Sequence, residues 1–101
     1  MPYIKEEARF YLDNTISILA NLISEDRDLS DEEFVSIVGE LNYSISRLLA
    51  KVMNKPSYSK IAMITGVLEN VKQEFYRRIA SPYEDAKMSA NGDLPEYKKY
   101  E

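Results

Sequence analysis

The sequence contains no cysteine and no histidine among its 101 residues. Because protein zinc sites are built mainly from these two residue types, we expect no zinc centre. A cysteine nucleophile, a serine–histidine triad and histidine acid–base catalysis are excluded for the same reason. Disulfide bonds cannot stabilise the fold. Carboxylate-bound Mg²⁺ or Mn²⁺ remains as the metal chemistry open to this chain.

Glycine and proline are also scarce, with 3 and 4 residues, which favours long regular elements over many turns. No apolar run reaches the length of about 18 residues that a membrane helix needs. The N-terminus lacks the apolar stretch of a signal peptide. We therefore expect a cytoplasmic protein with no membrane partner, made of one helical domain over residues 1–92 and a loosely ordered tail over residues 93–101.

Positive charge is in the minority, with 13 basic and 17 acidic residues and a formal net charge of −4. Non-specific binding of nucleic acid needs a basic face, so we expect none. Hydrophobic residues make up 45% and charged residues 30%, which is the composition of a globular protein.

Hydrophobic side chains recur at helical spacing through most of the chain. The pattern predicts long amphipathic helices over residues 5–24, 31–54 and 58–80, and a short helix over residues 82–90. The fold class is therefore all-α, with three long helices and a short C-terminal helix in an antiparallel helical bundle. The breadth of the hydrophobic stripes predicts assembly as a homo-oligomer, because one seam cannot cover them.

The second predicted helix has the widest stripe. Its main positions alternate spacings of four and three residues: Phe34, Val38, Leu41, Ile45, Leu48 and Val52. Such a helix lies centrally in the monomer or also faces another subunit. Gly39 here and Gly66 in the next helix favour close helix crossing. Asn42, at the edge of the stripe, makes a tertiary hydrogen bond or touches a ligand; the sequence leaves both open.

Helix ends are marked by recognisable caps. Ser30 with Glu33, and Ser81 with Pro82 and Glu84, match the pattern of a capping box. Asn91 and Gly92 match a left-handed helix C-terminus. The acidic residues around Ser30 are read as cap and solvated loop, with a cation site as the alternative.

The third predicted helix combines basic and aromatic side chains near its end. Arginine forks suit phosphate or carboxylate ligands, and tyrosine rings offer stacking surfaces. The simpler interpretation is a solvated face of ion pairs such as Glu74–Arg78. Our candidate ligand-binding residues are Glu40, Asn42, Tyr43, Arg47, Lys72, Tyr76, Arg77, Arg78, Tyr83, Lys87 and Asn91, with no catalytic residue among them.

Several sequence segments together resemble a family of small uncharacterised prokaryotic and phage helical proteins. The segments are GELNY, EFYRR, PYED and NGD, which begin at Gly39, Glu74, Pro82 and Asn91. The resemblance implies no activity. It implies that the following are motif positions of that family: Glu40, Asn42, Tyr43, Arg77, Arg78, Tyr83, Glu84, Asp85, Asn91 and Asp93.

A weaker similarity is to the all-α nucleoside-triphosphate pyrophosphohydrolases, which hold Mg²⁺ on paired carboxylates and have a lysine and an asparagine near the end. Lys87 and Asn91 suit that last element. The carboxylate pairs do not match, because Ile37 precedes Glu40 by three residues and Lys72 follows Glu69 by three. Under this alternative the Mg²⁺ ligands are Glu40, Glu69, Glu84 and Asp85.

We favour binding over catalysis, because histidine is absent and no carboxylate set is convincing. The first hypothesis is a non-enzymatic homo-oligomer that holds a small anionic, nucleotide-like ligand at a subunit interface, with no cofactor. In organisation it is similar to phage proteins that sequester cyclic-nucleotide signals. The alternatives are the Mg²⁺-dependent hydrolase, and an adaptor or inhibitor that contacts a host protein through tail residues such as Tyr97 and Tyr100.

Overall fold

The computed structural model describes residues 4–27 and 29–98, and the described residues are helical with no strand among them. The all-α prediction is confirmed. The chain divides into two compact units, residues 1–56 and residues 57–101, and each is described here by itself. The arrangement of the helices as one bundle, the assembly into a homo-oligomer and the single-domain boundary stay predictions.

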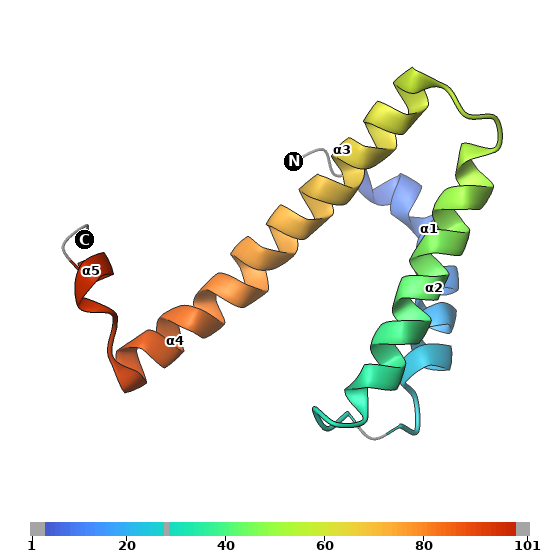
Figure 1. Ribbon diagram of the computed structural model, residues 1–101. Helices are drawn as coiled ribbons and strands as arrows, with labels where there is room; N and C mark the ends of the chain where they lie inside the picture. The colour runs from blue at the N-terminus through green and yellow to red at the C-terminus, as the bar shows by residue number, and fades with distance from the viewer. Residues whose placement is uncertain (1–3, 28, 99–101) are drawn as a thin grey trace. The chain divides into compact units, whose positions relative to one another are not determined.

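The first unit is a helical hairpin of α1 (Glu6–Ser24) and α2 (Phe34–Met53), which lie side by side (Figure 1). Ile23 and Ile37 are 8% and 4% exposed and are the two buried hydrophobic residues among those described. An ion pair between Arg27 and Glu40 closes the end of the hairpin near the connecting loop. The hairpin therefore has a small buried apolar region and one ion pair between its connecting loop and α2.

The predicted end of α2 is confirmed, but its start differs. The Ser30 hydroxyl accepts a hydrogen bond from the Glu33 backbone N–H at 3.5 Å, as a cap would. Residues 31–33 form turns, however, and regular α-helix starts at Phe34. The helix ends at Met53, and Asn54 follows with a φ of 55° and its N–H bonded to the Ala50 carbonyl.

The second unit consists of α3 (Tyr58–Phe75), the π-helix η1 (Tyr76–Ala80), α4 (Ser81–Asn91) and the four-residue α5 (Pro95–Lys98). The first three follow one another without a break in the helical ribbon (Figure 1). Ser57 caps α3, its hydroxyl accepting from the Lys60 backbone N–H at 3.2 Å. Gly92 follows the end of α4, as predicted, but its φ of 89° and ψ of 159° are not those of the predicted left-handed cap.

The predicted break at Ser81 and Pro82 is wrong. Ser81 caps nothing, and helical backbone runs through Pro82. Proline lacks an N–H, and in a regular α-helix its ring would clash with the carbonyl of Arg78, four residues earlier. The wider turn of η1, in which the Ser81 N–H bonds to the Tyr76 carbonyl, relieves this conflict. Proline here changes the helix type instead of ending the helix.

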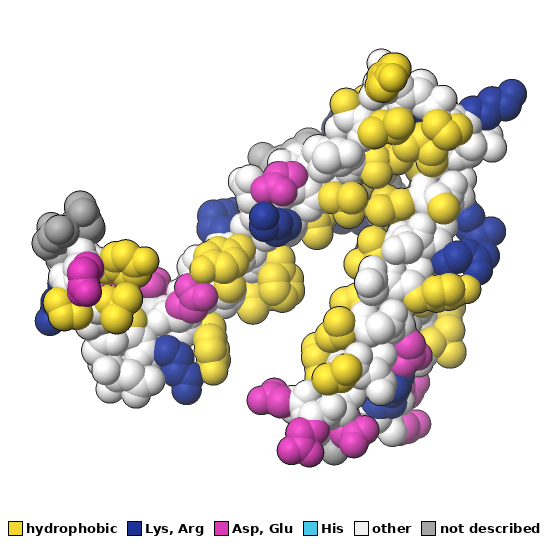
Figure 2. Space-filling model, in the orientation of Figure 1, with side chains coloured by type: hydrophobic (Ala, Val, Ile, Leu, Met, Phe, Trp, Pro, Cys, Tyr) yellow, Lys and Arg dark blue, Asp and Glu magenta, His cyan; other side chains and the backbone are white. Residues whose placement is uncertain are grey.

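The expected close crossing at Gly39 and Gly66 is not seen. A Cβ atom built on either glycine would meet no atom within 4 Å. Most hydrophobic side chains are also exposed, and Figure 2 shows them at the surface over both α2 and α3. The described structure therefore leaves its apolar stripes largely uncovered.

Candidate functional site

The candidate residues fall into two groups, one in each unit. Four lie on α2: Glu40, Asn42, Tyr43 and Arg47. Seven lie on the α3–η1–α4 helix: Lys72, Tyr76, Arg77, Arg78, Tyr83, Lys87 and Asn91. The groups are described separately below.

The strongest polar cluster in the second unit has Glu74 at its centre. Its Oε1 atom accepts from Arg77 Nη2 and from Arg78 Nε, both at 2.5 Å. The Glu74 side chain is 17% exposed, whereas those of Arg77 and Arg78 are 66% and 61% exposed. The predicted Glu74–Arg78 pair is confirmed. Two guanidinium groups therefore share one carboxylate oxygen at the surface.

Tyr76 and Glu84 meet across η1. The Tyr76 hydroxyl lies 2.9 Å from Glu84 Oε2 and 3.1 Å from Oε1, and it donates to the carboxylate. An α-helix brings residues three, four or seven apart onto one face. The extra residue in the π-helical turn brings residues eight apart together here. The contact explains why Glu84 does not form the predicted capping box.

The hydrogen bond to Glu84 raises the pKa of the Tyr76 phenol above its ordinary value, and the negative charge of the same carboxylate adds to the effect. The neutral phenol is a donor that the carboxylate stabilises, whereas a phenolate would repel it. Tyr76 therefore stays a hydrogen-bond donor at physiological pH and is no nucleophile or base.

Two further basic side chains near the cluster have local partners. Lys72 Nζ lies 3.7 Å from Glu69 Oε1, which also accepts from Gln73 Nε2 at 3.1 Å. Lys87 Nζ lies 5.6 Å from the centre of the Tyr83 ring, within the range of a cation–π contact. The structure thus brings Tyr83 and Lys87 together, and it pairs Lys72 with Glu69.

The α2 group shows the same local pairing. Arg47 Nη1 donates to the Tyr43 hydroxyl at 2.7 Å, and the guanidinium lies 5.6 Å from the centre of that ring. Asn42 Oδ1 accepts from the Ser46 hydroxyl at 3.5 Å. Glu40 is the partner of Arg27. Each contact spans one helical turn, except the Arg27–Glu40 ion pair, which joins the loop to the helix.

The carboxylates assigned to Mg²⁺ under the enzymatic alternative each lie in a different local setting. Glu40 pairs with Arg27, Glu69 with Lys72 and Glu84 with Tyr76. Asp85 lies on the exposed surface of α4. Within residues 4–27 and 29–98 no group of three acidic side chains is placed to hold a metal ion.

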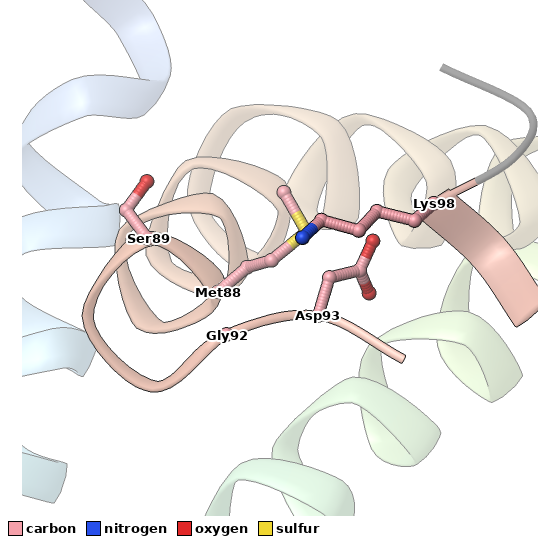
Figure 3. A pocket seen from close by; sticks show the side chains of 5 residues that line it. All are labelled: Met88, Ser89, Gly92, Asp93 and Lys98. Carbon is pink, nitrogen blue, oxygen red and sulfur yellow. The ribbon is translucent and has the colours of Figure 1, made fainter. Parts of the chain in front are cut away.

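One pocket lies at the end of the second unit, and the sequence did not predict it. It has a volume of about 290 Å³ and is lined by Met88, Ser89, Gly92, Asp93 and Lys98. Figure 3 shows the side chains that line it, including Met88, Lys98 and Asp93, and the Asp93 carboxylate accepts from the Leu94 N–H at 2.7 Å. The NGD segment pointed to Asp93, but no periodic signal predicted α5, which supplies Lys98.

These features define a class: a small all-α protein whose polar residues form short local pairs on exposed helices. The chain belongs to the family described as Domain of unknown function (DUF6899), whose model matches residues 1–94. Neither the curated proteins nor the solved structures gave a match. Of the described helices, none is both long and apolar enough to cross a membrane.

Proposed function

We propose that this chain is a cytoplasmic, non-enzymatic homo-oligomeric binding protein that holds a small anionic, nucleotide-like ligand at a subunit interface. The observation that carries the proposal is the pair Arg77 and Arg78 on the single carboxylate of Glu74. A carboxylate that anchors two guanidinium groups fixes their position, and both groups are mostly exposed at the surface. Arginine held in this way suits phosphate and carboxylate groups.

The neighbouring residues support the same ligand class. The Tyr76 hydroxyl donates its one proton to Glu84 and is therefore not counted among the ligand donors. Tyr83 presents an aromatic ring that is 63% exposed, with Lys87 over it. A ring beside cationic groups offers a base a stacking surface and its phosphate a charged partner. A subunit interface would enclose this open surface and strengthen the ionic contacts.

The test is binding of nucleotide anions at low ionic strength. Isothermal titration calorimetry with ATP, a cyclic mononucleotide and pyrophosphate should detect binding by the native chain. The double variant Arg77→Ala, Arg78→Ala should bind roughly tenfold or more weakly, because it loses charge-assisted hydrogen bonds. Arg9→Ala, which removes an arginine from α1, is the matched control and should bind normally.

Absence of binding by the native chain to all three ligands would contradict the proposal. So would equal weakening by Arg9→Ala, since it would make the effect one of net charge alone. The same mixtures with Mg²⁺ test for catalysis, because turnover of ATP that is lost in Glu40→Gln would favour the hydrolase alternative.

A further inference from the structure

One face of α2 has the sequence pattern of a coiled-coil seam. Its hydrophobic positions alternate spacings of four and three residues over nearly three heptads. We call the following six side chains the α2 seam: Phe34, Val38, Leu41, Ile45, Leu48 and Val52. Each is between 42% and 66% exposed in the structure, although Ile37 on the adjacent face is buried against α1.

We infer that the α2 seam is covered by the α2 seam of a second copy of this chain, packed antiparallel about a two-fold axis near the middle of the helix. The inference rests on the homo-oligomeric part of the proposed function and names its partner, face and orientation. It does not depend on the anionic ligand.

The first argument is self-complementarity. In an antiparallel pair, each a position packs against a d position of the partner. One register satisfies all six seam positions together. It sets Phe34 against Val52 of the second copy, Val38 against Leu48, and Leu41 against Ile45, and the two-fold axis repeats each contact. No seam residue is left without an apolar partner.

The second argument is charge, which sets the orientation. Asp31, Glu32 and Glu33 lie just before the start of α2, Lys51 lies in its last turn, and Lys55 follows its end. An antiparallel pair brings the acidic end of each copy to the basic end of the other. A parallel pair would place six carboxylates together, and such like-charge juxtaposition is unfavourable.

The third argument is area. The six seam residues are each about half exposed. Together they offer on the order of 500 Å² per copy, or about 1,000 Å² for the pair, which reaches the lower end of specific interfaces. An isolated soluble chain rarely exposes an apolar patch of more than a few hundred Å².

The interface also gives Asn42 a role that the sequence left open. Asn42 directly follows a seam residue and lies near the middle of α2, so in this register it faces Asn42 of the second copy beside the axis. Its carbonyl oxygen already accepts from Ser46. Its amide N–H groups are then placed to donate to the symmetry-related side chain, which keeps a polar group satisfied at the edge of an apolar contact.

The test uses the absence of native cysteine, so that each introduced thiol is unique. Chains with Val38→Cys are mixed with chains with Leu48→Cys under mild oxidation. The antiparallel register predicts a disulfide between the two variants in several-fold excess over either self-linked dimer. The two substitutions differ in mass, so mass spectrometry distinguishes the products. Val38→Cys mixed with Ala50→Cys, which points away from the seam, is the control and should give no such excess.

Self-linked dimers of each variant as the main products would mean parallel packing and would overturn the inference. A native chain that sediments as a monomer up to about 100 μM would overturn it as well, and would assign the seam to another part of the same chain. A monomer that still binds ATP through Arg77 would contradict the α2 interface and support the anion site. A cross-linked dimer that binds no anion would support the α2 interface and contradict the anion site.

Discussion

At the scale of single residues, the chain satisfies its polar groups over short sequence distances. Glu74 holds Arg77 and Arg78 within one turn, and Arg47 reaches Tyr43 four residues earlier. Exposed pairs of this kind contribute a few tenths of a kcal/mol each. Their effect is to fix the direction of long side chains on an open helix surface, which is a condition for binding a ligand there.

Tyr76 makes the stability of the folded chain depend measurably on pH. Its pKa is raised in the folded chain, chiefly by the hydrogen bond to Glu84. A group whose folded pKa is raised contributes stability that is complete below its unfolded pKa, near 10, and that is lost as pH rises through the folded pKa. The difference in melting temperature between the native chain and Tyr76→Phe should therefore be present at pH 8 and shrink above pH 10.

The measurement is thermal unfolding followed by circular dichroism between pH 8 and 11. Tyr58→Phe is the control, because its side chain is 94% exposed at the start of α3. A difference that stays constant through pH 11 would contradict the role assigned to the Glu84 contact.

At the scale of elements, the α3–η1–α4 helix shows how one proline changes which residues share a face of the helix. The π-helical turn before Pro82 adds a residue to the turn, and everything after it is rotated relative to a regular α-helix. The rotation brings Glu84 under Tyr76, and the Tyr83–Lys87 pair lies on the α4 stretch that follows. The geometry of the candidate site thus follows from a backbone irregularity.

Replacing Pro82 by alanine should remove the cause of the π-helical turn. We expect regular α-helix through residue 82, an increase in the free energy of unfolding of up to about 3 kcal/mol, and loss of the Tyr76–Glu84 contact. The tyrosinate absorbance assigned to Tyr76 by difference from Tyr76→Phe should then titrate at a lower pH. An unchanged titration would mean that the turn persists without proline.

The two helical glycines offer a second test at this scale. Because an added Cβ meets nothing within 4 Å at Gly39 or Gly66, alanine at either position should gain helix propensity without a clash. Each substitution should raise the free energy of unfolding by about 0.5–1 kcal/mol in urea. Destabilisation by either would show that a neighbour packs closely at that glycine, as the sequence first suggested.

At the scale of the whole molecule, apolar burial is small. Ile23 and Ile37 are the hydrophobic residues that the described structure buries, and the large side chains of α1, α2 and α3 are mostly exposed. A domain of about 100 residues is stable by a small margin even when its core is closed. We therefore expect much of the stability of this protein to come from association.

That expectation predicts a melting temperature that depends on concentration, because association stabilises the folded chain by mass action. The native chain should melt at a lower temperature on each tenfold dilution. Ile45→Asp in the α2 seam should melt lower still and show no such dependence, whereas Ala50→Asp on the opposite side of α2 should behave like the native chain. A native melting temperature that does not change with dilution would contradict the association.

Most of the secondary structure could be read from the sequence because it follows from local rules. The three-and-four spacing of apolar residues indicated the helices, and the glycine at 92 marked the end of α4. The Glu74–Arg78 pair was predictable for the same reason. Fixed spacing on a helix places two side chains together whatever surrounds them.

The local rules failed where backbone and long-range geometry compete. Ser81, Pro82 and Glu84 match the pattern of a helix start, but the folded chain keeps the helix and sends Glu84 to Tyr76, because a π-helical turn accommodates proline. The Arg27–Glu40 ion pair and the pocket beside Asp93 also bring together residues that helical spacing in the sequence does not relate. The sequence alone determined that this protein is helical, free of cysteine and histidine chemistry, and broadly amphipathic. Tertiary structure alone decided which charges share a partner and which apolar faces stay open, because those depend on how turns redirect one helix against the next.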